Sequence, residues 1–291
     1  MARADLLIDA ATLKQRLDEG SNSLVLLDCR FSLGDPGAGR RQWLQGHIRG
    51  ASHADLDSDL SDLSQPSEQG RHPLPEHKHL ARRLRDWGID GESAVVVYDQ
   101  GPSVMAARAW WLLRAVGIDN VRVLDGGLKA WTAAGGAVET ADAAETVASE
   151  GVVGTECQLP RDRWLDNRQL SRALKAQSVA LVDAREAARY RGEIEPIDPV
   201  AGHIPGALSR PVADNLDAEG CFLPADTLRL AFDQLRGVHA PKQVVHQCGS
   251  GVAACHNLLA MEIAGLHGSK LHAPSWSGWL AGGGEVAKGG P

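Results

Sequence analysis

The sequence predicts an α/β fold made of two tandem domains, each a parallel sheet with helices on both faces. Three observations lead to this prediction. The chain has 291 residues, which is enough for two domains of ordinary size. Short apolar runs alternate with helical stretches, the pattern of a parallel sheet covered on both sides. The whole pattern then occurs again in the second half of the chain.

Equivalent landmarks recur in the two halves at a nearly constant spacing. The pairs are Asp28 with Asp183, Gly46 with Gly202, Asp99 with Cys248, and Trp131 with Trp279. Their separations are 155, 156, 149 and 148 positions, which agree within eight residues across a whole domain. Such agreement indicates a duplication.

The elements follow the same order in both copies. In the first copy we expect a helix carrying Leu13 and Leu17, strands over 24–30 and 95–99, and a helix over 104–117. In the second copy we expect a helix over 167–177, a strand over 179–185, a buried strand ending at Gln247 and a helix over 252–264. The short sequence Gly-His-Ile stands at 46–48 and again at 202–204.

We therefore divide the chain into a first domain over 1–136, a linker over 137–160 and a second domain over 161–291. The linker is rich in Ala, Glu, Thr and Gly and lacks strong periodicity. The segment 55–79 is polar, interrupted by prolines and expected to be a loop. Loops of that length in compact domains usually have a function.

Composition narrows the functional class. A net charge of −7 and a pI near 5.9 do not favour a nucleic-acid partner. No apolar run reaches membrane-spanning length, and the first residues lack the pattern of a signal peptide. The 5 cysteines are scattered and never spaced Cys-x-x-Cys. This is the pattern of a reduced, cytoplasmic protein without a disulfide framework or a zinc site.

Cys248 is the candidate nucleophile, because it stands where a buried strand ends and a buried helix begins. Free backbone N–H groups and the helix dipole converge on such a position and favour the thiolate, the reactive form. Gly249 and Gly251 permit backbone angles and close approach that a side chain would forbid. A lone cysteine is most often a small buried hydrophobe, but this glycine-bracketed context favours a nucleophile.

The run Cys-Gly-Ser-Gly-Val-Ala at 248–253 closely resembles the active-site loop of the rhodanese-like sulfurtransferases, in particular the 3-mercaptopyruvate branch. The resemblance extends over nearly the whole chain and implies two rhodanese-like domains with the active site in the cleft between them. Asp99 stands where Cys248 stands in the other copy. The first domain is therefore expected to be catalytically silent.

The resemblance also implies roles for the residues after the cysteine. The backbone amides of Gly249, Gly251, Val252 and Ala253 would cradle a persulfide and contact the donor. Ser250 would hydrogen-bond the sulfur or the donor, although a helix N-cap without chemistry is an equal interpretation.

Arg189 matches the arginine that binds the substrate carboxylate in this branch, a task that suits a bidentate guanidinium. Without the resemblance it would be read as a solvated loop arginine. Three departures stand out: Ile197 replaces an expected second substrate-binding arginine, Ala253 replaces a threonine, and His-Ala-Pro at 272–274 replaces Tyr-Asp-Gly.

Asp57 and His72 align with an acidic residue and a histidine that are proposed, in the same branch, to form a relay with the loop serine. A histidine can move a proton near neutral pH while a carboxylate orients it. The other interpretation of both residues is a polar loop.

The sequence thus predicts a sulfurtransferase that carries a sulfane sulfur on Cys248 between a small-molecule donor and a thiol acceptor, with neither a metal nor an organic cofactor. We expect 3-mercaptopyruvate as donor, with thiosulfate as the alternative. The acceptor would be a thioredoxin-like protein or a small thiol, with cyanide as a test acceptor. A cysteine phosphatase would need an arginine where Ala254 stands. A non-catalytic sulfur-carrier or regulatory module remains a third alternative.

Overall fold

The computed structural model describes residues 2–20, 24–141 and 157–290, and it contains two five-stranded sheets that are parallel throughout. The strand order is β1-β6-β5-β2-β4 in the first sheet and β8-β12-β11-β9-β10 in the second. Numbered along their own half of the chain, the strands follow the same order in both sheets. The predicted α/β fold with two copies of one plan is therefore confirmed.

The strands are short. The first sheet comprises β1 (Leu7–Ile8), β2 (Leu24–Asp28), β4 (Ala51–His53), β5 (Ala94–Tyr98) and β6 (Val121–Leu124). The second comprises β8 (Trp164–Leu165), β9 (Ala180–Asp183), β10 (Leu208–Ser209), β11 (Val244–Gln247) and β12 (Lys270–His272). The central strands β9 and β11 are buried along their whole length, as parallel strands covered on both faces must be.

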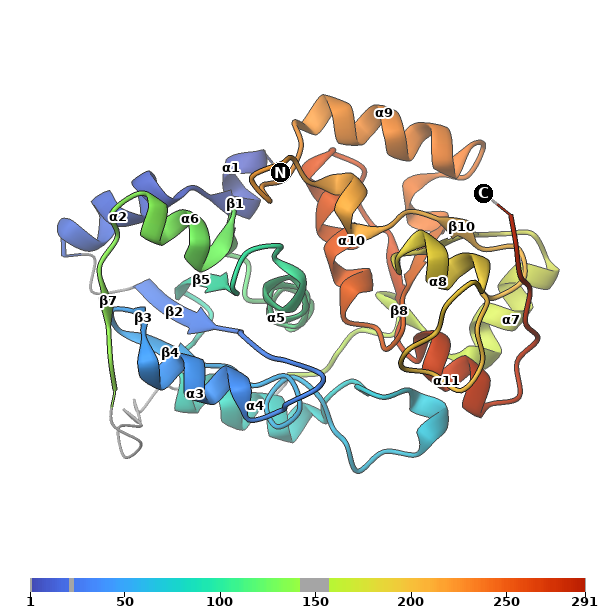
Figure 1. The fold of residues 1–291 in the computed structure, drawn as a ribbon, viewed down its shortest axis with the longest axis horizontal. Helices are drawn as coiled ribbons and strands as arrows, with labels where there is room; N and C mark the ends of the chain where they lie inside the picture. Colours follow the sequence, from blue (N-terminus) through green and yellow to red (C-terminus); the bar gives the residue numbers. More distant parts are fainter. Residues whose placement is uncertain (1, 21–23, 142–156, 291) are drawn as a thin grey trace.

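Helices lie around both sheets (Figure 1). Those of the first half are α1 (Arg3–Leu6), α2 (Ala10–Asp18), α3 (Ala38–Gln45), α4 (His77–Asp86), α5 (Val104–Ala115) and α6 (Gly127–Ala133). Those of the second half are α7 (Asn167–Lys175), α8 (Ala187–Arg191), α9 (Ala225–Arg236), α10 (Ala253–Ile263) and α11 (Ser275–Ala281). Three short 3₁₀ helices are η1 (Ser67–Gln69), η2 (Val212–Asn215) and η3 (Pro241–Gln243).

The expected elements are present, with ends that differ by a few residues, and the structure adds elements that the sequence pattern did not indicate. The segment 55–79, expected to be a loop, contains η1 and the beginning of α4 at His77. At the start of the expected linker, β7 (Val138–Glu139) pairs antiparallel with β3 (His47–Ile48). The greater part of that linker, 142–156, lies outside the described residues.

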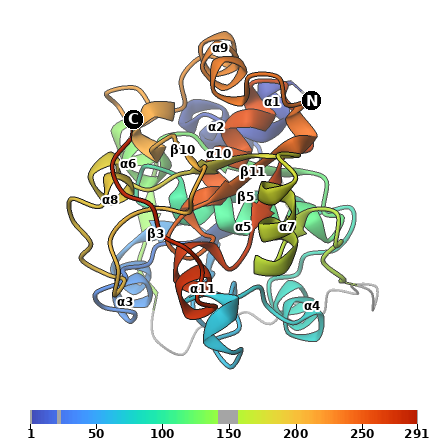
Figure 2. The ribbon, with the colours of Figure 1, turned by 90° about the vertical axis from the view of Figure 1, so that its right-hand side faces the viewer.

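The two halves share one hydrophobic core. Helices α5 and α10 pack against each other between the two sheets, and nearly every residue of both helices is buried (Figures 1 and 2). A helix that is buried on all sides needs apolar residues on most of its surface. In α5 these include the adjacent residues Trp110 and Trp111, and in α10 they include Leu258 and Leu259. This seam places the amino end of α10, and the turn before it, against the first half.

A second contact joins the loop around η1 to α11, on the side of the molecule away from α9 (Figures 1 and 2). Glycines make the approach possible. A Cβ atom on Gly278 would lie 2.8 Å from the Glu68 carbonyl oxygen, and one on Gly70 would lie 2.4 Å from that of Pro274. The residues that follow η1 are thereby carried to the active-site loop of the second half. Among the described helices, none combines the length and hydropathy needed to cross a membrane.

Candidate active site

Cys248 follows directly on β11, and its side chain is almost fully buried. The Gly251 N–H donates to its Sγ at 3.2 Å, so the turn folds back over the sulfur as expected for an anion cradle. The main chain of Cys248 is fixed on both sides. Its N–H donates to Ser275 Oγ at 3.1 Å, and its carbonyl accepts from the Trp276 N–H at 2.9 Å.

The turn depends on Gly251. Its φ is +81°, and a Cβ atom there would lie 2.6 Å from the Ala273 carbonyl oxygen. Within the described part of the chain, the N–H groups of Val252 and Ala253 find no hydrogen-bond acceptor. They stand at the amino end of α10, where unpaired N–H groups and the helix dipole attract negative charge. These groups are available to a sulfur anion.

Ser250, His72 and Asp57 lie in one line, with a hydrogen bond between Ser250 and His72 and a polar contact between His72 and Asp57. Ser250 Oγ is 2.7 Å from His72 Nδ1, and His72 Nε2 is 3.3 Å from Asp57 Oδ1. Ser250 caps no helix, since the N-cap position of α10 belongs to Val252. A polar loop alone does not account for this geometry, because His72 contacts a serine 178 positions further along the chain and Asp57 lies on the other side of its ring.

His72 is held in the neutral form. Burial, together with the guanidinium groups of Arg108 and Arg71, lowers the pKa of His72 to about 3. Nε2 faces the Asp57 carboxylate, which can only accept, so we assign the single ring hydrogen to Nε2. Nδ1 is then unprotonated and accepts the hydroxyl hydrogen of Ser250. Burial, and then the charge of Asp55, raise the pKa of Asp57.

Arg189 of α8 reaches the loop but is already paired with carboxylates. Its Nη2 lies 2.5 Å from Glu195 Oε1 and 3.2 Å from Asp198 Oδ2. A Cβ atom on Gly249 would lie 3.8 Å from the same Nη2, so the guanidinium stands over the residue next to the nucleophile. The sequence prediction gave Arg189 no partner, and the structure gives it two.

Arg71 is a basic residue of the site that the sequence reasoning missed. Its Nη1 lies 2.7 Å from Asp198 Oδ1, and its Nη2 would be 3.2 Å from a Cβ atom on Gly249. Ile197, where a second arginine was expected, is instead a partly exposed apolar residue. The second guanidinium therefore comes from the first half of the chain, and the only signal for it was its place beside His72.

Arg108 of α5 was also missed. It is fully buried, its Nη1 donates to the Gly251 carbonyl at 3.3 Å, and its Nη2 donates to the His72 carbonyl at 3.3 Å. Further bonds go to the carbonyls of Leu60 and Pro73. Burial lowers the pKa of Arg108. This side chain ties the active-site loop of the second half to residues 60–73 of the first.

Cys248, Ser250, His72, Arg71 and Arg189 line a cavity of about 390 Å³ that contains groups from both halves. Besides these residues, the charged side chains of Arg185 and Glu186 and the rest of the active-site loop, its wall is apolar. The apolar lining residues outside the loop are Leu33, Leu56, Pro102, Val104, Met105, Ala184, Ile197, Pro211, Val212, Ala213 and Leu216. A small polar donor would therefore be held by few polar groups, all near Cys248.

Several residues outside the line of Ser250, His72 and Asp57 have structural roles. His203 stacks on Tyr190, and His47 stacks on Trp43, so the histidine of the Gly-His-Ile turn packs on an aromatic ring in both copies. Arg185 is paired with Asp183 at 2.7 Å. Cys255 is fully buried, its Sγ donates to the Gly251 carbonyl at 3.4 Å, and burial raises its pKa to about 12. Cys255 is therefore a protonated core thiol.

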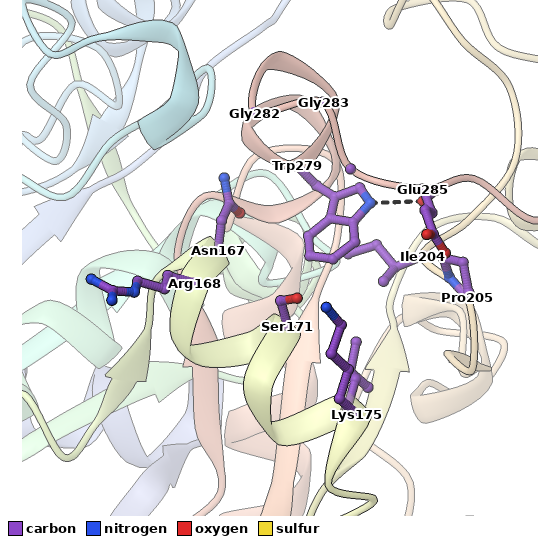
Figure 3. Close-up of a pocket in the computed structure, with 12 residues that line it drawn as sticks. Asn167, Arg168, Ser171, Lys175, Ile204, Pro205, Trp279, Gly282, Gly283 and Glu285 are labelled. Atoms are coloured by element: carbon purple, nitrogen blue, oxygen red, sulfur yellow. Dashed lines mark hydrogen bonds between the residues drawn. The ribbon is translucent and has the colours of Figure 1, made fainter.

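A larger cavity, of about 590 Å³, lies between α7 and the turn at 282–285 (Figure 3). Trp279 forms its wall and donates to the Glu285 carbonyl at 2.8 Å. In the first half Trp131 makes the equivalent bond to the Ala137 carbonyl. The tryptophan hydrogen bond thus recurs in both copies, including the half that lacks Cys248, and we therefore assign it to the fold.

Comparison with known proteins agrees with this architecture. The family model of the rhodanese-like domain matches residues 9–134 and 166–282. A relative from Pseudomonas aeruginosa that carries the name of a 3-mercaptopyruvate sulfurtransferase is 45% identical over 275 residues, 94% of each chain. A Mycobacterium tuberculosis relative that carries the name of a thiosulfate sulfurtransferase is 38% identical, over 96% of this chain and 95% of its own length. The crystal structure of a 3-mercaptopyruvate sulfurtransferase from Escherichia coli superposes with a TM-score of 0.76 at 29% identity, covering 93% of this chain and 98% of that one.

Proposed function

Because this chain belongs to the rhodanese family and is a sulfurtransferase, we propose that it takes sulfur from 3-mercaptopyruvate onto Cys248 and passes it to a thiol. The observation that carries the proposal is the convergence on one loop of a buried cysteine, a Ser250–His72–Asp57 line and two guanidinium groups. The named relatives support the donor, and the site geometry supports the residues.

In the first half-reaction the Cys248 thiolate attacks the sulfur of 3-mercaptopyruvate. A sulfur–sulfur bond forms, the carbon–sulfur bond breaks, and its electron pair leaves on the carbon as pyruvate enolate. The proton of the donor thiol ends on that carbon, which gives pyruvate and a Cys248 persulfide anion. The Gly251 N–H already donates to the sulfur, and the unpaired N–H groups of Val252 and Ala253 at the amino end of α10 would stabilise this anion.

Ser250 is the group placed to carry the proton. Its hydroxyl hydrogen is directed at the unprotonated Nδ1 of neutral His72, and Asp57 fixes the orientation of that ring. Arg189, together with Arg71, faces the side of the loop where the donor carboxylate would lie. We assign Ser250, His72 and Asp57 to proton transfer and Arg189 to donor binding.

In the second half-reaction the thiolate of an acceptor attacks the outer sulfur of the persulfide. The bond between the two sulfurs breaks, its electrons return to Cys248, and the acceptor leaves as a persulfide. No other group is needed to balance the step. We propose a small thiol or a thioredoxin-like protein as acceptor. The chain's cysteines are all unpaired in the described structure, which fits a reducing, cytoplasmic setting.

We also propose that the domains extend over 1–136 and 161–291 and that the first is catalytically silent. In the first domain, Asp99 occupies the position of the nucleophile.

Intact-mass measurement after incubation with 3-mercaptopyruvate tests the proposal. The chain should gain the mass of one sulfur atom and lose it again when a small thiol is added. Cys248→Ser should gain nothing, whereas Cys255→Ser, which alters the neighbouring buried thiol, should load like the natural chain. Sulfur on the chain in the absence of Cys248 would contradict the proposal. A parallel arm with thiosulfate decides between the two donors, since the Mycobacterium relative favours that alternative.

A further inference from the structure

Six charged side chains run in an alternating line from the core to the donor cavity. The order is Asp183, Arg185, Glu195, Arg189, Asp198, Arg71. Successive partners are separated by 2.7, 3.4, 2.5, 3.2 and 2.7 Å. The line holds three positive and three negative charges, so its formal sum is zero. It is most exposed at its outer end, where 28% of the Arg71 side chain is accessible.

Asp198 is the last carboxylate of the line and the one that holds the two cavity arginines together. One of its oxygens accepts from Arg71 and the other from Arg189, and only 2% of its side chain is accessible. Both guanidinium groups stand over Gly249, next to the nucleophile. Arg71 still has hydrogens to offer, because among the described residues nothing accepts from its Nε–H.

We infer that Asp198 sets the charge preference of the donor site, by fixing Arg71 and Arg189 over the loop while cancelling one of their two charges. This inference rests on the proposed function. Glu195 offsets the charge of Arg189 and Asp198 offsets that of Arg71, so the two forks of N–H donors belong to a line of zero formal charge. A donor with one negative charge, such as 3-mercaptopyruvate with its single carboxylate, can be held by the N–H donors of these forks. A dianion such as thiosulfate brings a second negative charge that the line does not offset. Arg71 supplies the second guanidinium group that was expected at position 197, where the chain has Ile197.

The test measures kcat/KM for 3-mercaptopyruvate and for thiosulfate separately. Asp198→Asn keeps the shape of the side chain and removes its charge, so the ratio of thiosulfate to 3-mercaptopyruvate should rise about tenfold, and kcat/KM for thiosulfate should rise on its own. Arg71→Gln removes a positive charge and should move the ratio in the opposite direction, chiefly through KM. Glu193→Gln is the matched control, because Glu193 is an exposed carboxylate paired with Arg191 on the same segment.

A ratio that stays within about twofold of the natural chain in both variants, or that moves in the reverse directions, overturns the inference. Should Asp198→Asn not fold, Arg71→Gln still decides, since Arg71 lies at the accessible end of the line. Failure of the proposed function looks different: the natural chain would then load no sulfur from either donor. If the natural chain were active with thiosulfate but not with 3-mercaptopyruvate, the proposed donor would be wrong. The effect of each variant on kcat/KM for thiosulfate would still test the role of Asp198.

Discussion

Asp99 and Cys248 end equivalent strands, and the loop after Asp99 shows what this kind of turn binds. The Asp99 carboxylate accepts the N–H groups of Gly101 and Ser103, each at 3.0 Å, and of Met105 at 2.9 Å. An anion therefore already occupies the cradle of the first copy. In the second copy the equivalent cradle surrounds a sulfur atom, with N–H groups left over for a second sulfur.

Four buried histidines make the stability of the folded chain depend on pH. Burial is the largest cause that lowers the pKa of each to about 3; the four are His72, His246, His256 and His272. Each stays neutral in the folded chain below pH 6.5, where the unfolded chain binds a proton. The contribution of these neutral histidines to the free energy of unfolding is therefore complete above pH 6.5, and it is lost as the pH falls towards 3.

His246→Leu should reduce this acid sensitivity. His246 is fully buried in β11, where its Nε2 lies 3.0 Å from the Met261 sulfur, a weak hydrogen-bond partner. Between pH 7 and pH 5 the natural chain should lose about 2 kcal/mol more of its free energy of unfolding than the variant does. Urea unfolding at the two pH values measures the difference. His77→Gln, at an exposed position on α4, should keep the natural dependence. Identical slopes for all three chains would contradict the assignment.

At the scale of elements, the strand–turn–helix unit from β11 to α10 depends on backbone geometry more than on side chains. Gly251 combines a left-handed φ with contact to the Ala273 carbonyl, and its N–H donates to the nucleophile. Gly135, at the end of α6, has a similar φ of +73° but open space around its Cα. Replacing each glycine by alanine therefore distinguishes two contributions to the loss of stability. Gly135→Ala reports the effect of the left-handed backbone angle alone, whereas Gly251→Ala reports that effect together with the contact to Ala273.

Gly251→Ala should destabilise the chain by clearly more than Gly135→Ala, which should cost about 1 kcal/mol. The added contact must push the turn away from β12, so the N–H leaves the sulfur and loading of Cys248 should fall at least tenfold. Chemical unfolding and intact-mass loading measure the two effects. Equal losses of stability in both variants would show that the contact with Ala273 does not matter.

At the scale of the whole molecule, the active site is assembled from both halves. The first half contributes His72, Asp57, Arg71 and Arg108, and the second contributes the nucleophile and its loop. The contact between η1 and α11 is what positions His72 and Arg71, because both residues follow η1 within a few positions. The geometry of this contact thus controls a site to which η1 itself does not belong.

Gly278→Ala tests that control. The new methyl group would meet the Glu68 carbonyl and the Gly70 nitrogen, each at 2.8 Å, so η1 must move away from α11. We expect kcat/KM for the donor to fall about tenfold and the free energy of unfolding to fall by about 1–3 kcal/mol. Gly91→Ala, where the added Cβ meets nothing within 4 Å, serves as the control and should change neither. Steady-state kinetics and urea unfolding supply both values.

The sequence predicted those features that depend on local pattern. The repeat predicted two sheets of one topology, and the strand–glycine–helix context singled out Cys248. The family resemblance placed Ser250, His72 and Asp57 together, and the structure brings them into contact. Arg71 and Asp198 could not be found in this way. Their pairing joins residues 127 positions apart. The contact between η1 and α11 brings Arg71 to the second half, and that contact leaves no periodic signal in the sequence.

The shared core of α5 and α10 has a consequence for how the donor and the acceptor reach Cys248. Separating the halves would expose the largely apolar surfaces of two buried helices to water, so opening the molecule between its halves would be unfavourable. Reactants must come to Cys248, a residue of which 2% is accessible, through the cavity that both halves line. A small metabolite can enter a cavity of this size, whereas a macromolecular acceptor could insert only a cysteine at the tip of a slender projection.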